Sequence, residues 1–243
     1  MNRHAYDLHL HSCLSPCGDE EMTPNSIAGM AKLNGLSLLA LTDHNTTANA
    51  AAFYAACRRY GIVPIAGAEL TTAEDIHLVT LFPTLESALD FDADLAPYRI
   101  AVPNRPEIFG RQLLVDENDE ILGERADLLT NALSLSLSEA ADFARRYGAA
   151  CYPAHIDRES NGAVAVLGDF PHDLGFTCYE LADSANRLSY EQRYSLGGLR
   201  SVVSSDAHVL WNISEGENAL MLSGESEEEI RSELISLLGG RGE

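Results

Sequence analysis

Residues 36–44 read Leu-Ser-Leu-Leu-Ala-Leu-Thr-Asp-His. The first seven form an apolar run of strand length, which indicates a strand buried on both faces if the sheet is parallel. Asp43 and His44 follow where this strand ends and a loop begins. A buried strand that ends in metal-competent side chains is the pattern from which we interpret the rest of the chain.

Strand and helix signals alternate on both sides of this run. Before it, residues 6–10 alternate apolar and polar, and Thr23-Pro24 opens a helix with Thr23 as its cap. After it, Thr46 or Thr47 is expected to cap a second helix. Further strands are expected at 62–69, 76–82, 149–154, 176–181 and 200–204, and helices at 85–95, at 138–147 with Ser138 as cap, and at 226–238. This alternation predicts an α/β fold with a parallel sheet, either a barrel or a doubly wound layer.

The middle of the chain is less regular. Residues 99–109 read as an extended loop, and residues 111–115 and 120–123 flank the turn sequence Asp-Glu-Asn-Asp. This pattern predicts a β-hairpin inserted at about residues 99–125. One domain over residues 1–243 that carries this insertion is the simplest account.

Composition limits the partners that the protein is expected to have. The net charge is −21, no basic run is present, and Lys32 is the only lysine. Such a surface repels nucleic acid, so we expect a small phosphorylated substrate and no long nucleic acid. No apolar run approaches the roughly 18 residues that span a bilayer, and the N-terminus lacks a signal-peptide core. We therefore expect a cytoplasmic protein without a membrane partner, and the oligomeric state cannot be read.

The five cysteines are odd in number and irregularly spaced. They indicate reduced and mostly buried thiols. Cys13 and Cys17 lie in the loop after His11, so one of them is a candidate for the rim of a metal site.

Six histidines lie at or beside the ends of short apolar runs, with carboxylates close by. The histidines are His9, His11, His44, His77, His155 and His208, and the carboxylates are Asp7, Asp43, Glu69 and Asp206. Neutral imidazole is the commonest metal ligand, and imidazole with carboxylate indicates a hydrolytic Zn, Mn or Fe site rather than a structural zinc knot. Because a barrel brings its strand ends to one mouth, these residues favour barrel-like closure over an open sheet.

The spacing within the candidate ligands adds to this interpretation. His9 and His11 are two residues apart on a strand and therefore point to the same face, where Asp7 could orient an imidazole. Asp206 and His208 repeat that spacing. Glu69 has the charge to bridge two cations, although by itself it could equally be a helix-capping carboxylate.

Taken together, these motifs resemble the PHP (polymerase and histidinol phosphatase) domain superfamily. The resemblance rests on Asp-Leu-His-Leu-His-Ser, Ala-Leu-Thr-Asp-His-Asn, Gly-Ala-Glu, a histidine on the next strand, Pro-Ala-His and Ser-Ser-Asp-Ala-His, in this order over residues 6 to about 210. It implies a distorted (β/α)7 barrel and phosphoester hydrolysis in a cleft with two or three divalent metal ions (Mn, Zn or Fe).

The resemblance also implies the ligand sets. The first metal would be held by His9, His11, Glu69 and Asp206, the second by Glu69, His77 and His155, and the third by His44, His208 and a carboxylate from the loop after His11. The family usually has that aspartate five residues after the second histidine, where this chain has Pro16. Counting back from Thr23-Pro24 selects Asp19 as this ligand, and Glu20 is the alternative.

The resulting hypothesis is a metal-dependent phosphoesterase that hydrolyses a small phosphorylated metabolite or nucleotide with a metal-activated water. Arg158, three residues after His155, is a candidate phosphate clamp or else forms a surface salt bridge with Asp157 or Glu159. Arg105 and Arg111, near the expected hairpin, are candidates for substrate selection.

Two other functions compete with this hypothesis. One is a metal-binding PHP module with a structural or regulatory role and no turnover, against which the full ligand set argues. The other is amidohydrolase-type hydrolysis of C–N bonds, which would need a carboxylated lysine on a barrel strand. The only lysine, Lys32, lies on an expected helix.

Overall fold

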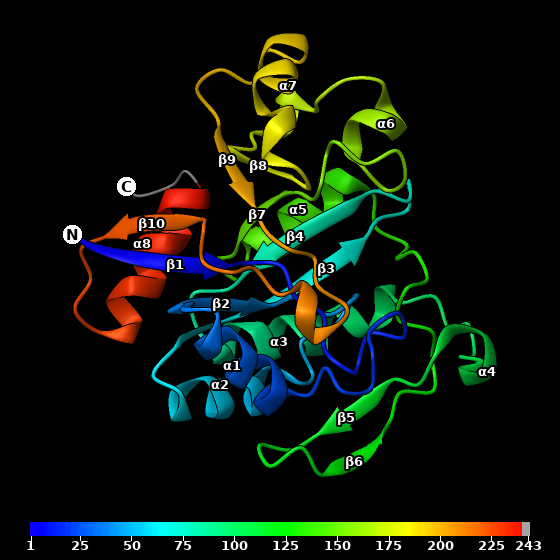
Figure 1. The fold of residues 1–243 in the computed structure, drawn as a ribbon. Coiled ribbons are helices and arrows are strands. Elements are labelled where there is room, and N and C mark those ends of the chain that lie inside the picture. The colour runs from blue at the N-terminus through cyan, green and yellow to red at the C-terminus, as the bar shows by residue number, and fades with distance from the viewer. Residues whose placement is uncertain (240–243) are drawn as a thin grey trace.

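The computed structural model describes residues 1–239 and has a mixed α/β fold (Figure 1). A six-stranded sheet has the order β10-β1-β2-β3-β4-β7, and β5–β6 and β8–β9 form separate two-stranded sheets. The strands are β1 (Asn2–Asp7), β2 (Leu38–Leu41), β3 (Val63–Thr71), β4 (His77–Leu81), β5 (Leu113–Val115), β6 (Ile121–Glu124), β7 (Ala150–Pro153), β8 (Cys178–Leu181), β9 (Arg200–Val203) and β10 (Ala219–Leu222). The helices are α1 (Pro24–Leu33), α2 (Ala50–Arg59), α3 (Leu85–Leu95), α4 (Pro106–Phe109), α5 (Leu137–Arg145), α6 (Ala163–Leu167), α7 (Arg187–Arg193) and α8 (Glu227–Gly239).

The sheet is mixed rather than parallel throughout. The pairs β1–β2, β2–β3 and β8–β9 are parallel, whereas β4 runs antiparallel to both β3 and β7. Only residues 72–76 separate β3 from β4, and a parallel crossover needs a dozen or more residues. The expectation of an all-parallel sheet is therefore wrong at β4, and the sheet forms a curled half-barrel.

Local signals placed several elements correctly. Thr23 caps α1 by accepting the backbone N–H of Ser26, as predicted, and α3 covers the predicted residues. The other two predicted caps are wrong. The Thr46 hydroxyl donates to Asp92 at 2.7 Å while α2 begins at Ala50. Ser136, not Ser138, forms the capping box of α5, so this cap lies two residues earlier than expected.

The first strand begins and ends earlier than expected. Asn2 to Ala5 pair antiparallel with β10, a strand that the sequence analysis did not predict. The chain stays extended beyond the end of β1, where Leu10 forms a parallel bridge with Ala207. His9 and His11 flank this bridge and are fully buried.

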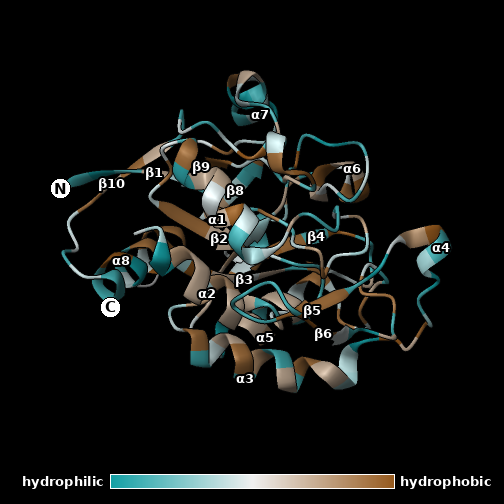
Figure 2. Ribbon diagram, turned by 60° about the horizontal axis from the view of Figure 1, so that its bottom comes forward, coloured by the Kyte–Doolittle hydropathy of each residue, from teal (hydrophilic) through white to brown (hydrophobic). Residues whose placement is uncertain are grey.

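Both faces of β2 are buried, as residues 36–42 predict. Leu39 and Leu41 belong to a core under α1, α2, α3 and α5, whereas Leu38 and Ala40 face a second core that α8 covers. Figure 2 shows this central strand in brown, and α3 alternates between brown and teal because only one side of it faces the core. The sheet is therefore packed on both faces, which fixes where its strands end.

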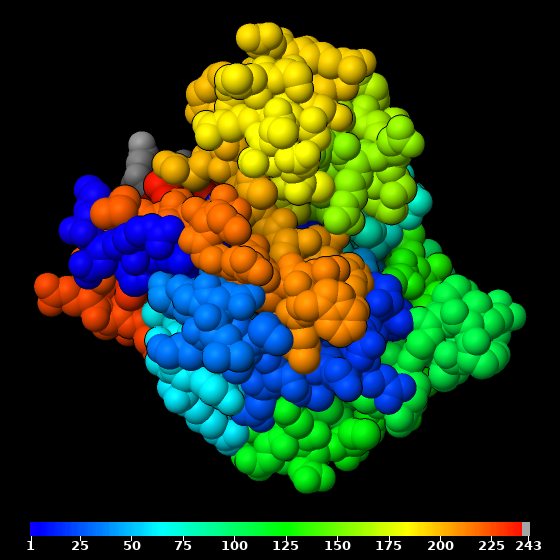
Figure 3. Space-filling model, viewed as in Figure 1, coloured from blue at the N-terminus to red at the C-terminus, as the bar shows by residue number. Residues whose placement is uncertain are grey.

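Two parts extend away from the central sheet. β5 and β6 pair antiparallel beside α4, and the chain segment that contains α7 forms a projection on another side (Figures 1 and 3). Within residues 1–239, no helix is long and apolar enough to cross a membrane. The last residues of the expected single domain, 240–243, lie outside the described part, and the domain and insertion boundaries stay predictions.

Candidate metal centre

The metal-competent side chains meet along one edge of the sheet. His9 and His11 follow β1, His44 follows β2, and Glu69 lies near the end of β3. His77 begins β4, and His155 follows β7. Because β4 is antiparallel to both β3 and β7, its first residue lies beside their last residues. Asp206 and His208 follow β9 and complete the cluster.

Three groups of potential ligands are close enough to hold cations. Within each group, the donor atoms lie within 4.8 Å of one another. The groups are His9, His11, Glu69 and Asp206; His44, Glu69 and His77; and His11, His44 and His208. The structure thus brings together the residues expected at the first site. Neighbouring groups share His11, His44 and Glu69, so they form one continuous centre.

Glu69 lies at the middle of this centre and is 1% exposed. Its Oε1 lies 2.8 Å from His77 Nδ1, 3.1 Å from His155 Nε2 and 3.3 Å from His9 Nε2. Its Oε2 lies 3.2 Å from His44 Nδ1 and 3.3 Å from His11 Nε2. His155 Nε2 therefore lies next to the second group, close to Glu69 and His77, and the two carboxylate oxygens face different sets of imidazoles.

Electrostatics keep the carboxylates ionised and two imidazoles neutral. Burial alone would raise the pKa of Glu69, but His77, His9 and His44 hold it well below its usual range. Burial also opposes ionisation of Asp206, and His9 and His11 nevertheless lower its pKa. Burial pushes the pKa of His44 well below 6.5, and burial with the nearby His11 lowers the pKa of His208 to about 4. Burial opposes protonation of His9 and His11, but Glu180 and Glu69 raise the pKa of His9 well above its usual value, and Asp206 and Glu69 raise that of His11 to about 9. Because metal binds neutral imidazole and ionised carboxylate, a cation here would displace a proton from each of these two histidines.

Unpaired polar atoms and backbone strain fit a cation site. His155 Nδ1 is buried and makes no hydrogen bond in the described chain. His44 Nδ1 and Asp206 Oδ1 are also buried, and their close contacts are with other candidate ligands, Glu69 Oε2 at 3.2 Å and His11 Nε2 at 3.0 Å. His155 and Asp206 also have positive φ angles of 24° and 50°. Such backbone costs on the order of 1–3 kcal/mol per residue and is concentrated at functional sites. The donor set of imidazole and carboxylate suits zinc, manganese or iron.

Buried polar groups behind the ligands orient two of the imidazoles. Glu180 Oε1 lies 2.9 Å from His9 Nδ1, which leaves His9 Nε2 free to face the centre. Ser15 Oγ lies 3.1 Å from His11 Nδ1 and donates to Asp43 at 2.7 Å. Sequence reasoning missed Glu180, although an acid inside the apolar run 176–181 was a signal.

Asp7 does not have the orienting role that its spacing suggested. Its carboxylate accepts the backbone N–H groups of Ser205 at 3.0 Å and Ser214 at 3.1 Å. Asp7 therefore connects β1 to the segments after β9 and contacts neither imidazole through these bonds.

The loop carboxylates lie outside the three groups. Asp19 is exposed, and its Oδ1 accepts the backbone N–H of Glu21 at 2.8 Å. The backbone N–H of Asp19 donates to the His208 carbonyl at 2.8 Å, so the loop itself lies beside the centre. Glu20 pairs with Arg111 at 3.3 Å. The structure does not bring either carboxylate to His44 and His208.

The candidate arginines have different surroundings. Arg158 lines the pocket over the centre and donates to Asp206 Oδ2 at 2.5 Å, rather than pairing with Asp157 or Glu159. The Arg105 guanidinium lies 5.7 Å from the centre of the Phe109 ring, and Arg111 also pairs with Glu124 at 2.5 Å. Of these three arginines, only Arg158 lines the pocket.

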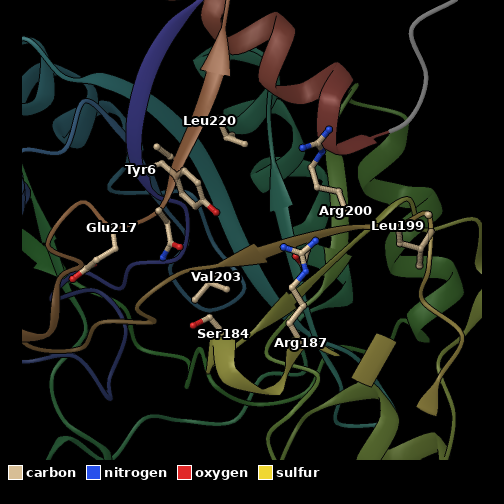
Figure 4. A pocket seen from close by; sticks show the side chains of 12 residues that line it. Tyr6, Ser184, Arg187, Leu199, Arg200, Val203, Glu217 and Leu220 are labelled. Atoms are coloured by element: carbon tan, nitrogen blue, oxygen red, sulfur yellow. The ribbon is translucent and has the colours of Figure 1, made fainter. Parts of the chain in front are cut away.

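The pocket over the centre has a volume of about 290 Å³. Its lining includes Cys17, His44, Glu69, His77, His155, Arg158, Asp206 and His208. A larger cavity of about 570 Å³ lies between β1, β9 and β10, where Tyr6, Arg187 and Arg200 line it (Figure 4). None of its lining residues belongs to the three ligand groups, so the chemistry is assigned to the smaller pocket.

The imidazoles and carboxylates gathered at one edge of this curled α/β sheet form a donor set able to bind metal ions, as in metal-dependent enzymes. The family model of the PHP domain matches residues 7–159. This chain therefore belongs to the PHP domain family.

Two curated proteins match shorter parts of the chain. An error-prone DNA polymerase of Symbiobacterium thermophilum is 42% identical over 74 residues, which are 30% of this chain and 7% of that protein. A 5'-3' exoribonuclease of Haemophilus influenzae is 37% identical over 79 residues, which are 31% of this chain and 28% of that protein. The chain thus spans less than a third of the length of either relative.

Solved structures match nearly the whole chain. Endonuclease Q from Pyrococcus furiosus has a TM-score of 0.66 at 20% identity, and the match covers 99% of this chain and 57% of that one. A protein from Bifidobacterium adolescentis, described as a metal-dependent phosphoesterase, has a TM-score of 0.58 at 18% identity, with 98% and 99% covered. At these identities the matches establish likeness of fold.

One of these matches corrects the expectation about partners. A complex of endonuclease Q with a 27-mer duplex that has an abasic lesion at the active site matches with a TM-score of 0.65 at 20% identity, covering 99% of this chain and 57% of that one. The expectation of a small phosphorylated substrate and no long nucleic acid is therefore wrong. Net charge is a weak guide to partners because it averages over the whole surface, whereas substrate binding depends on the local field at the site.

Proposed function

We propose that this protein is a metal-dependent phosphodiesterase that cleaves nucleic acid. The observation that carries this proposal is the position of Glu69, whose two oxygens each lie within 3.3 Å of separate imidazoles. A carboxylate in that position can bridge two cations, and paired cations suit an in-line displacement at phosphorus. The polymerase, exoribonuclease and endonuclease relatives support nucleic acid as the substrate class.

Divalent cations held by the three groups would polarise a phosphoryl oxygen and lower the pKa of an attacking water toward neutrality. The chain's own residues provide the positioning. Glu180 holds His9 by its Nδ1, and Ser15 with Asp43 holds His11, so both Nε2 atoms face the centre. Arg158 extends a guanidinium into the pocket, where it can bind two phosphate oxygens.

The charge distribution limits how much nucleic acid the protein can grip. The net charge is −21, and Arg158 is the one Lys or Arg among the residues that line the pocket. We propose that contact is confined to a few nucleotides around the cleaved bond. Since each neutralised phosphate in duplex DNA contributes about −0.9 to the slope of log affinity against log salt, this slope should be shallow, no steeper than about −3.

The test uses protein purified without chelators and loaded with zinc, manganese or iron. End-labelled single-stranded DNA, RNA, duplex DNA and duplex DNA with an abasic site are each incubated with it, and products are separated by length. We expect cleavage of at least one substrate that EDTA abolishes and added metal restores. Glu69→Gln should abolish both cleavage and metal retention, whereas Glu86→Gln, on the exposed face of α3, should change neither.

A metal-loaded sample that cleaves none of these substrates would overturn the proposal. It would then favour the alternative, a metal-binding module with a structural or regulatory role and no turnover. His9→Ala provides a second check. It should remove at least one ion and the activity while circular dichroism stays unchanged, because His9 is a ligand rather than a core contact.

A further inference from the structure

The group of His11, His44 and His208 lacks a charged donor. Its three imidazoles lie within 4.8 Å of one another, and no carboxylate belongs to this group. Each of the other two groups contains at least one carboxylate. His11 Nδ1 contacts Ser15, and His11 Nε2 faces Glu69 and Asp206 in the first group. A cation held here by His44 and His208 therefore needs further ligands, and an anionic one would also offset its charge.

The loop after His11 presents a thiol to this group. Cys17 lines the pocket together with His44 and His208. It is also the one exposed cysteine, since Cys13, Cys57, Cys151 and Cys178 are all buried. Asp19 and Glu20, from the same loop, are held by Glu21 and Arg111. Cys17 is therefore the donor from this loop that faces the pocket.

The backbone on both sides of Cys17 is held in place. Gly18 packs so closely that a Cβ there would lie 2.6 Å from the Ser12 carbonyl oxygen. Asp19 donates its N–H to the His208 carbonyl at 2.8 Å. On the other side, a Cβ on Gly110 would lie against the Pro16 carbonyl oxygen. This packing keeps Cys17 beside His208.

A buried atom of His44 faces another candidate ligand without a hydrogen bond. His44 is 5% exposed, and its Nδ1 lies 3.2 Å from Glu69 Oε2 but forms no hydrogen bond in the described chain. Buried polar atoms are normally hydrogen-bonded, so this arrangement indicates a cation nearby. His44 belongs to both groups that meet in this part of the pocket.

We propose that the Cys17 thiolate is a ligand of the cation bound by His44 and His208. Cys17 lies on the pocket wall, and its thiol would lose its proton to solvent as the metal–sulfur bond forms. Imidazole and thiolate ligands favour zinc, iron(II) or cobalt(II) over manganese or magnesium, because thiolate is a soft ligand. This inference rests on the proposed metal centre and does not require turnover.

The test substitutes cobalt(II), whose bonds to thiolate absorb in the near ultraviolet. The wild-type protein loaded with cobalt should show this band, and Cys17→Ser should lose it together with one equivalent of metal by mass spectrometry. Cys13→Ala is the matched control, because Cys13 lies four residues away in a small apolar cluster with Leu113 and Val115. It should keep both the band and the metal content. Asp19→Asn should also keep both.

Two results would overturn the inference. One is an unchanged cobalt spectrum and metal count in Cys17→Ser. The other is the absence of the sulfur band from the wild-type protein together with the loss of one ion from the Asp19→Asn variant. Both readouts are independent of cleavage, so an inactive protein that shows the band would refute the proposed function and leave this inference standing.

Discussion

Removing the Glu180 carboxylate tests how strongly a residue that hydrogen-bonds to a candidate ligand affects metal affinity and stability. Glu180 is 1% exposed and accepts a hydrogen bond from His9 Nδ1 at 2.9 Å and from the His155 backbone N–H at 3.3 Å. Glu180→Ala leaves both donors buried and unpaired, at about 1–3 kcal/mol each. His9 also becomes free to rotate or to change tautomer. Substitution of a residue that hydrogen-bonds to a metal ligand typically lowers metal affinity about 10–100-fold.

The assay is competition between the protein and a chromophoric chelator, with stability measured by denaturant unfolding. We expect Glu180→Ala to lose about 10–100-fold in metal affinity and about 2–6 kcal/mol of unfolding free energy. Glu180→Gln keeps an acceptor oxygen and should lose less of both. Glu191→Gln, at an exposed ion pair with Arg187 (2.8 Å), is the control and should change neither. If Glu180→Ala binds metal as tightly as the wild type, the orienting role is refuted.

Three further predictions test the packing, the metals and the phosphate contact. Gly67→Ala should lower the unfolding free energy by about 1–3 kcal/mol, because its Cβ would lie 2.6 Å from the Thr80 carbonyl oxygen, whereas Gly123→Ala meets nothing within 4 Å and should be neutral by denaturant titration. Chelation should lower the melting temperature and added metal should restore it, since an ion at a hundred times its Kd contributes about 2.7 kcal/mol; a thermal scan that does not respond to EDTA would contradict a filled centre. Arg158→Ala should lower kcat/KM about 10–100-fold at unchanged metal content, and Arg158→Lys should lower it less. Loss of metal in the alanine variant would instead mean that Arg158 mainly holds Asp206, to which it donates at 2.5 Å.

The candidate metal ligands were recognisable from sequence because their signal is local. Each lies at or beside the end of a short apolar run. The ends of neighbouring strands lie close together at one edge of a sheet, so residues that follow them come together. The structure brings His9, His11, His44 and Glu69 together as that argument requires. The cap of α1 and the span of α3 were predictable for the same reason, since they depend on a few adjacent residues.

Features that depend on distant partners were not predictable. Glu180 lies 171 residues from His9, and no pattern around residue 180 identifies its partner. Arg158 pairs with Asp206 rather than with its sequence neighbours. The cap of α5 was predicted at Ser138 instead of Ser136 because both serines fit the local pattern. The expectation about partners was a poor one because it rested on a summed charge, which does not describe the field at one pocket.

The sequence by itself determined which residues can hold cations and that they follow buried strands, because hydrophobic periodicity and residue chemistry are properties of short segments. Tertiary structure decided that β4 runs antiparallel, so that His77 lies at the end of β3, and that Asp19 turns outward while Cys17 faces the pocket. Strand direction and loop orientation follow from contacts between residues far apart in the chain, and only the folded molecule brings those residues together.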